Sequence, residues 1–271
     1  MKHVAGIDVG AKFIKVVLLG DDGVKAKTKL QCGIEAADAA EQALHDTLRL
    51  AGLALTDLGA VVATGFGRNV APHATDRVTE AMADARGANL LMPHVRTLVD
   101  VGAEEGRGIR VGPEGQVVDF AGNEKCAAGS GSFTESMARA LEVDVRDFAR
   151  ISLDSTQAVP MNAQCTVFAE SEVVSLIHAN TPKADIARAV HDAIASRIAA
   201  TVRRCGFEPP VALIGGVAHN PGFADSLKRE MGLDALEIPP DPEFVGALGA
   251  ALIALESIGP VAASRNGGSA A

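Results

Sequence analysis

The sequence of 271 residues contains no Trp and no Tyr, and aromatic residues make up only 3% of it. Stacking of aromatic side chains on bases or sugars is therefore not expected to be the main mode of recognition. An excess of positive charge is also absent, since the formal net charge is −9. Nucleic-acid binding requires a basic patch, and the scattered Lys and Arg residues do not predict one.

Long apolar runs are missing as well, and no segment reaches the roughly 18 apolar residues of a membrane span. The first ten residues, MKHVAGIDVG, lack the apolar stretch and the small-residue cleavage site of a secretory signal. We therefore expect a cytoplasmic protein with no membrane partner. In that compartment the four cysteines, at positions 32, 126, 165 and 205, are expected to be thiols, metal ligands or catalytic groups rather than disulfides.

The composition, with 48% hydrophobic residues, is that of an ordinary soluble protein, and the scarcity of aromatic residues predicts a core of Ala, Val, Leu and Ile. The strand and helix patterns along the chain predict an α/β fold. Apolar alternation and helical spacing predict three strands, a helix and a buried strand in the first part of the chain. The strands are expected at 4–7, 14–19, 24–30 and 60–64, and the helix at 37–51. Further helices are expected at 133–141, 145–151, 167–179 and 183–205, followed by a strand, a glycine turn and a helix from 211.

The opening design of strand, Asp-x-Gly turn and strand occurs twice. Asp8-Val9-Gly10 matches Asp100-Val101-Gly102 in sequence and in the strand-like segments around it. The repeat predicts two related lobes. Lobe I is expected to comprise residues 1–94 completed by a C-terminal helix at 243–258, lobe II residues 95–242, and residues 261–271 a flexible tail.

An Asp at the end of a strand before a tight glycine turn is suited to reach Mg²⁺ or its waters, while the N–H groups of the turn face phosphate. Asp8 and Asp100 are the candidates for the Mg²⁺ shell. The phosphate-facing candidates are Gly10, Ala11, Lys12, Gly102 and Ala103. Lys15 is expected either to face phosphate or to be an ordinary lysine on the strand surface. A plain strand and turn is the alternative for each motif.

Two carboxylates follow the second turn, and either Glu104 or Glu105 is expected to orient a water for phosphoryl transfer; a solvated acidic turn is the alternative. In "LIGGVAHNPGF", Gly215 and Gly216 would let a nucleotide approach the backbone before Asn220 starts a helix. A simple connection between strand and helix is the alternative there.

The segment "NEKCAAGSGSF" places Cys126 just before Gly129, Ser130 and Gly131, whose N–H groups open a helix and favour an anion. A Walker A sequence is absent, so an ordinary P-loop is not expected. Cys126 and Cys165 both precede helices, where the dipole stabilises a thiolate. One chain with two such ligands cannot complete a four-thiolate iron–sulfur cluster, whereas two chains can. Two buried thiols are the alternative, and that interpretation is preferred for Cys32 and Cys205.

The order of the motifs, Asp-x-Gly, Asp-x-Gly and Gly-Gly, resembles the actin-like ATPase fold shared by acetate kinase, the heat-shock ATPases and actin. That fold has two duplicated lobes with the nucleotide in the cleft. "NEKCAAGSGSF", "NAQCTVFAESEVVSL" and "ATGFGR" further resemble signature segments of the BadF/BadG/BcrA/BcrD ATPase family. The resemblance implies that Cys126 and Cys165 hold a [4Fe–4S] cluster shared between two subunits, besides ATP and Mg²⁺.

The run Gly102-Ala103-Glu104-Glu105 resembles the D-type ATPase subunit of benzoyl-CoA reductase, because other branches usually carry Gly-Gly-Gln-Asp there. Ala11-Lys12-Phe13 also departs from relatives that carry small hydroxyl residues. This resemblance implies an anaerobic, ATP-driven oxidoreductase component in a heterotetramer. Its partners would be a paralogous ATPase subunit or a second copy, ferredoxin as electron donor, and a module that binds benzoyl-CoA. The alternatives are a homodimeric activator of a 2-hydroxyacyl-CoA dehydratase, a small-molecule kinase of the same fold, and a non-enzymatic actin-like assembly protein.

Overall fold

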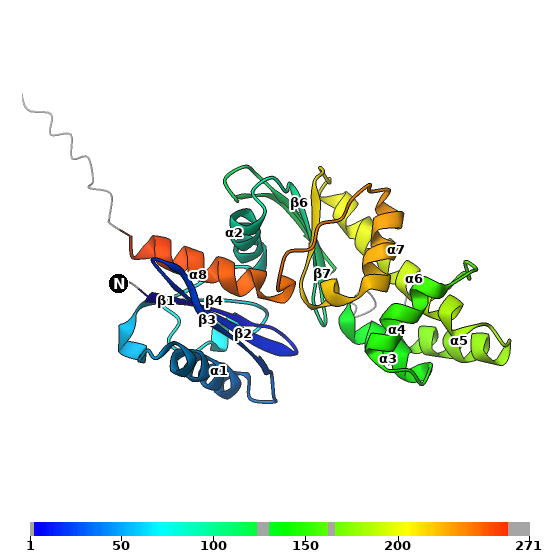
Figure 1. Cartoon of the computed structure of the whole chain (residues 1–271), viewed down its shortest axis with the longest axis horizontal. Helices are drawn as coiled ribbons and strands as arrows, with labels where there is room; N and C mark the ends of the chain where they lie inside the picture. The colour runs from blue at the N-terminus through cyan, green and yellow to red at the C-terminus, as the bar shows by residue number, and fades with distance from the viewer. Residues whose placement is uncertain (1–2, 124–129, 162–165, 260–271) are drawn as a thin grey trace, which may run out of the picture.

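The structure is a computed structural model that describes residues 3–123, 130–161 and 166–259. Two β-sheets lie on either side of a layer made by two helices, and further helices cover the outer faces of the sheets (Figure 1). None of the helices in the described part of the chain combines the length and the apolar character needed to cross a membrane.

The first sheet has the strand order β3-β2-β1-β4-β5. Its first three strands form an antiparallel meander, and β1 pairs in parallel with β4. The helix α1 covers one face, so the predicted strands and the predicted helix of this region are confirmed. The bounds are β1 His3–Val9, β2 Phe13–Gly20, β3 Gly23–Gln31, α1 Ala36–Ala51, β4 Leu58–Thr64 and β5 Asp76–Arg77.

The second sheet has the order β8-β7-β6-β9 and repeats the pattern of the first. Its first three strands are again an antiparallel meander, and β6 pairs in parallel with β9 as β1 does with β4. Each repeat therefore places its Asp-x-Gly turn after the strand that pairs in parallel with a later strand. The bounds are β6 Thr97–Val101, β7 Gly106–Val111, β8 Val117–Gly122 and β9 Val211–Ile214.

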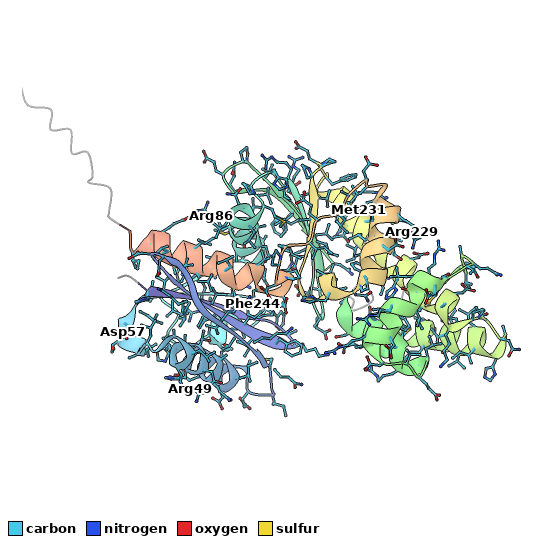
Figure 2. The ribbon with its side chains drawn as sticks, viewed as in Figure 1. Arg49, Asp57, Arg86, Arg229, Met231 and Phe244 are labelled. Atoms are coloured by element: carbon cyan, nitrogen blue, oxygen red, sulfur yellow. The ribbon has the colours of Figure 1, made fainter. Side chains whose placement is uncertain are left out.

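The layer between the sheets consists of α2 (Glu80–Leu91) and α8 (Val245–Ser257). The backbone of α8 lies close to those of β1 and α2. A Cβ added to Gly6 would lie 2.0 Å from the backbone oxygen of Ala247, and one added to Gly249 would lie 1.7 Å from the backbone oxygen of Ala83. The residue before α8, Phe244, lies with its ring 4.9 Å from Lys27 Nζ of β3 (Figure 2). The start of α8 is thereby attached to the first sheet.

Five helices pack on the far side of the second sheet around a core that includes Phe133, Phe148 and Phe223. Each of the four helices predicted between 133 and 205 is present, as is the helix predicted after the Gly-Gly turn. The bounds are α3 Gly131–Ala140, α4 Val145–Ile151, α5 Thr166–His178, α6 Lys183–Arg204 and α7 Pro221–Met231. Short 3₁₀ turns occupy Leu55–Asp57, Arg68–Val70, Ser152–Asp154, Gly216–His219 and Pro242–Phe244.

Candidate functional site

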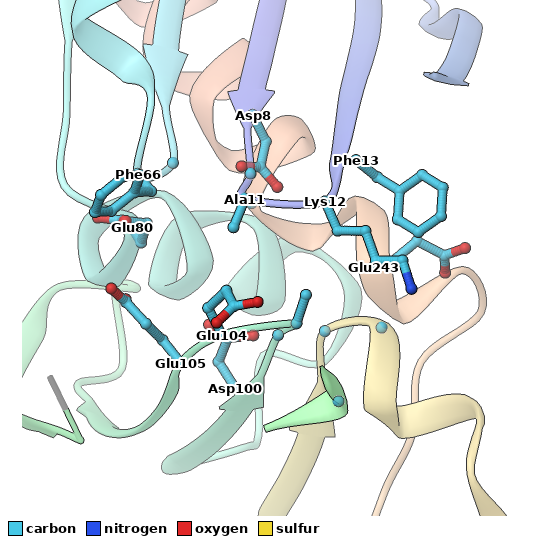
Figure 3. A pocket seen from close by; sticks show the side chains of 18 of the residues that line it. Asp8, Ala11, Lys12, Phe13, Phe66, Glu80, Asp100, Glu104, Glu105 and Glu243 are labelled. Atoms are coloured by element: carbon cyan, nitrogen blue, oxygen red, sulfur yellow. The ribbon is translucent and has the colours of Figure 1, made fainter. Parts of the chain in front are cut away.

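A cavity of about 450 Å³ opens between the two sheets, and both Asp-x-Gly turns line it (Figure 3). Parallel strands that end at one edge of each sheet bring their following turns to this place. The structure thus collects most of the residues that the sequence singled out. Those lining the cavity are Asp8, Gly10, Ala11, Lys12, Lys15, Asp100, Gly102, Ala103, Glu104, Glu105, Gly131, Gly215 and Gly216.

Asn220 is not among the residues that line this cavity. Its side chain accepts a hydrogen bond from the backbone N–H of Phe223 at 2.9 Å and so caps α7, while its Nδ2 lies 3.0 Å from His191 Nε2. Ser130 is buried at the start of α3 and does not line the cavity either. Gly129, Cys126 and Cys165 lie outside the described residues.

Of the other two cysteines, Cys205 agrees with the predicted buried thiol, whereas Cys32 is only half-buried. Cys205 follows α6, is buried, and its thiol lies 3.1 Å from the carbonyl oxygen of Val202. Burial raises the pKa of the Cys205 thiol. Cys32 follows β3 and is half-buried.

Lys15 lies opposite Asp8 in the β1–β2 register, and its Nζ is 2.7 Å from Asp8 Oδ2. Both side chains are only 15% exposed. Burial alone would lower the pKa of Lys15, but the adjacent Asp8 carboxylate outweighs it and raises that pKa. The expectation of an ordinary surface lysine is therefore wrong, because Lys15 lines the cavity and neutralises Asp8.

Arg107 takes the equivalent place beside Asp100 in the second repeat. The two residues are paired in the β6–β7 register, and Arg107 Nη1 lies 3.3 Å from Asp100 Oδ2. Arg107 also pairs with Glu105, and its Nη2 lies 3.8 Å from Glu80 Oε1. Burial raises the pKa of Asp100 even though Arg107 opposes the shift. Arg107 was not predicted from the sequence, although a basic residue lies seven positions after each Asp of the two repeats.

Two glycines pass against the two aspartates in the same way. Gly65 after β4 has φ 91°, and Gly215 after β9 has φ 85°. A Cβ at Gly65 would lie 2.5 Å from Asp8 Oδ1, and one at Gly215 would lie 2.5 Å from Asp100 Oδ1. A side chain at either position would meet both an unfavourable backbone angle and a carboxylate. The two repeats therefore share not only their strand order but also the contact between this glycine and the aspartate.

Both Asp-x-Gly turns also contact α3, the helix that follows residues 124–129. The N–H groups of Gly131 and Ser132 donate to the carbonyl oxygens of Gly102 and Ala103, each at 2.9 Å. The Ser132 hydroxyl donates to Glu104 at 2.8 Å. Lys12, from the first turn, donates to both carboxylate oxygens of Glu135 at 2.5 and 2.6 Å.

The charges around the cavity indicate which kind of ligand it can bind. Eight Asp and Glu side chains but only four Lys and Arg side chains line it. A polyphosphate would be repelled by this lining unless a divalent cation accompanied it. Among the described residues no three Asp, Glu, His or Cys side chains are placed to ligate one ion directly. The lining therefore fits a magnesium nucleotide whose ion keeps several of its waters, which is the usual manner of Mg²⁺.

Comparison with known proteins finds relatives that match more than nine tenths of the chain. A family model described as the BadF/BadG/BcrA/BcrD ATPase family matches residues 5–254. The 2-hydroxyisocaproyl-CoA dehydratase activator of Clostridioides difficile is 36% identical over 94% of this chain and 95% of its own length. The structure of (R)-2-hydroxyglutaryl-CoA dehydratase component A from Acidaminococcus fermentans superposes with a TM-score of 0.89 at 35% identity, covering 95% of this chain and 99% of that one.

The D-type subunit of benzoyl-CoA reductase from Thauera aromatica is 31% identical, over 93% of each chain. Relatives named as dehydratase activators thus match at higher identity than the reductase protein does. Structural similarity to sugar kinases at low identity also establishes that the chain has the actin-like ATPase fold.

Proposed function

The chain belongs to the BadF/BadG/BcrA/BcrD ATPase family, and on that basis we propose that it is the ATP-hydrolysing activator of a 2-hydroxyacyl-CoA dehydratase. Identities of 36% to proteins named as activators, against 31% to the D-type subunit of benzoyl-CoA reductase, support the activator over the reductase component. The activator was the alternative in the sequence analysis, so the order of the two hypotheses is reversed.

In this proposal the two turns bind the phosphates of ATP through their N–H groups, and Asp8 and Asp100 hold Mg²⁺ through its waters. Lys15 and Arg107 keep these carboxylates in position. Glu104 or Glu105 orients the attacking water. Residues 1–94 with 243–258 form one lobe and residues 95–242 the other, and the lobes close over the nucleotide.

Cys126 and Cys165, supplied by each of two copies of the chain, would hold a [4Fe–4S] cluster, which supplies the low-potential electron when bound. The single observation that carries the coupling is the set of contacts between α3 and both phosphate-binding turns. Because α3 begins directly after the segment that contains Cys126, a change in the turns on ATP binding or hydrolysis is passed to that segment through Gly131 and Ser132. Ferredoxin would reduce the protein, and the dehydratase would accept the electron.

Anaerobic purification followed by iron analysis and an ATP hydrolysis assay tests the proposal. We expect about four iron atoms for two chains and hydrolysis that requires Mg²⁺. Cys126→Ser and Cys165→Ser should lose the iron and retain ADP binding, whereas the matched control Cys32→Ser should keep both. Full iron content in both of the first two variants would overturn the ligand assignment, and an absence of hydrolysis would overturn the ATPase.

The second candidate is the ATPase subunit of a benzoyl-CoA reductase, which Ala103-Glu104-Glu105 favours. The two candidates differ in assembly. An activator purifies as two identical chains and restores activity to a separate dehydratase, whereas the reductase subunit co-purifies with a second ATPase chain and a substrate-binding module. Identification of every co-eluting chain from the native source separates them.

A further inference from the structure

Two buried side-chain oxygens at the cavity have no hydrogen-bond partner in the described structure. They are Thr64 Oγ1, at the end of β4, and Asp84 Oδ2, on α2. Thr64 is 1% exposed and Asp84 is 6% exposed, and both residues line the cavity. Buried polar atoms nearly always have a hydrogen-bond partner. Two buried oxygens without one, both beside a cavity, therefore indicate that a bound group forms hydrogen bonds with them.

The position of Gly246 places these atoms near Asp8. A Cβ added to Gly246 would lie 3.0 Å from Asp84 Oδ1, 3.9 Å from Asp8 Oδ2 and 3.9 Å from Thr64 Cγ2. Three side chains from β1, β4 and α2 therefore surround one point at the start of α8. Because Gly246 has no side chain, the space between these three side chains stays open.

The charges at this point are not balanced. Asp8 is paired with Lys15, and Asp100 is paired with Arg107, whereas Asp84 makes no ion pair with any described residue within 4 Å. A cation is therefore the group that would complete the surroundings of Asp84.

We propose that Asp84 and Thr64 extend the magnesium site, so that their oxygens bind waters of the ion that Asp8 and Asp100 hold next to the nucleotide phosphates. The proposal rests on the proposed ATPase function. Binding through waters is required, because no three described carboxylates are placed to ligate one ion directly. Side chains that hold such waters usually change metal affinity about 10- to 100-fold when removed.

The test compares ADP affinity in EDTA and in saturating Mg²⁺, and measures Mn²⁺ binding to the ADP complex by the loss of the free-ion EPR signal. The probe ions are Mg²⁺ and Mn²⁺, and the protein is the full chain purified anaerobically. For Asp84→Asn we expect Mn²⁺ affinity in the ADP complex to fall at least about 10-fold. Affinity for metal-free ADP should stay equal or rise, since one negative charge has been removed from the cavity.

Asp234→Asn is the matched control, because Asp234 is exposed and the substitution removes the same charge; its Mn²⁺ affinity should equal that of the unmodified protein. Thr64→Val tests the site independently and should weaken Mn²⁺ binding several-fold. Unchanged Mn²⁺ affinity in both Asp84→Asn and Thr64→Val would overturn the proposal. A failure of the unmodified protein to bind ADP even with Mg²⁺ would be a different result, because it would overturn the ATPase function itself and this inference with it.

Discussion

Asp8 and Asp100 occupy equivalent positions in the two repeats, and each is held by the same kinds of neighbour. A basic residue lies opposite each aspartate on the next strand, and a glycine with positive φ passes beside it. The cation is an ion-pair partner for each carboxylate, and the glycine leaves room for its oxygens. Both carboxyl groups are therefore fixed in orientation, which is what binding of a hydrated ion requires.

The ion pair between Lys15 and Asp8 predicts a loss of stability when the lysine is removed. Lys15→Met leaves a poorly solvated carboxylate without its partner, and the free energy of unfolding should fall by about 3 kcal/mol. Urea denaturation of the nucleotide-free protein measures the loss. Lys25→Met is the control on the neighbouring strand, since its pair with Asp22 is exposed and its removal should leave the unfolding midpoint unchanged. Equal effects of the two variants would contradict the prediction.

His191 on α6 predicts a dependence of stability on pH. It is fully buried against Phe148, and burial lowers its pKa from 6.5 to about 4. The unfolded chain then binds a proton more readily than the folded one. Its contribution to stability is present above pH 6.5 and is lost as the pH falls from 6.5 towards 4, with a total of about 3 kcal/mol.

Urea denaturation at several pH values in this range checks the prediction for the unmodified protein and for His191→Gln. The variant should be less stable at neutral pH and should lose less stability on acidification. Parallel pH curves for the two proteins would show that His191 does not carry the effect.

At the scale of elements, the repeated sheets could be predicted from the sequence, but helix α2 was missed. The strands β1, β2 and β4 are buried along most of their length and read as short apolar runs, whereas β3 alternates, and turns separate them in the sequence. In α2 the buried residues include Ala81, Ala83, Ala85 and Ala88, which point in several directions. The helix packs on α8 on one side and on the second sheet on another, so it has no single apolar stripe to recognise. Glu80 and Asp84 were missed with it.

The contact between α2 and α8 predicts that Gly249 tolerates no side chain. A Cβ there would lie 1.7 Å from the backbone oxygen of Ala83, so the helices would have to separate. Gly249→Ala should lower the free energy of unfolding by about 1–3 kcal/mol and weaken ADP binding, because α2 carries Asp84 to the cavity. The midpoint of urea unfolding and a titration with ADP and Mg²⁺ check both effects.

Gly33→Ala provides the control for this change. A Cβ at Gly33 would meet no atom within 4 Å, and its φ is not in the left-handed region. The control should retain full stability and full ADP affinity. A Gly249→Ala protein as stable as Gly33→Ala would contradict the packing of the two helices.

At the scale of the whole molecule, the site combines residues that lie far apart in the chain. The pair Lys12 and Glu135 spans the cavity from the first turn to α3, and no local pattern in the sequence predicts it. The two Asp-x-Gly motifs predicted the two turns, because such a turn depends only on a few adjacent residues. The partners that fix them, Arg107, Glu80 and Glu135, depend on how the sheets and helices meet.

This pair predicts that Glu135 competes with phosphate for Lys12. Glu135→Gln releases the ammonium group and removes one negative charge from the lining, so affinity for ATP with Mg²⁺ should rise several-fold. Calorimetric titration with a non-hydrolysable ATP analogue measures the change. Glu142→Gln, at an exposed position after α3, is the control and should bind as the unmodified protein does. Weaker binding by Glu135→Gln would contradict the competition.

The proposed function requires that nucleotide in the cavity acts, through α3, on the segments proposed to bind the cluster. The most direct measurement is the EPR spectrum of the anaerobically purified, reduced protein, recorded before and after addition of saturating ATP with Mg²⁺. We predict a [4Fe–4S] signal whose shape changes with the nucleotide in the unmodified protein, and a smaller change when Ser132→Ala removes the hydroxyl contact to Glu104. A spectrum that stays the same although ATP binds would contradict the claim.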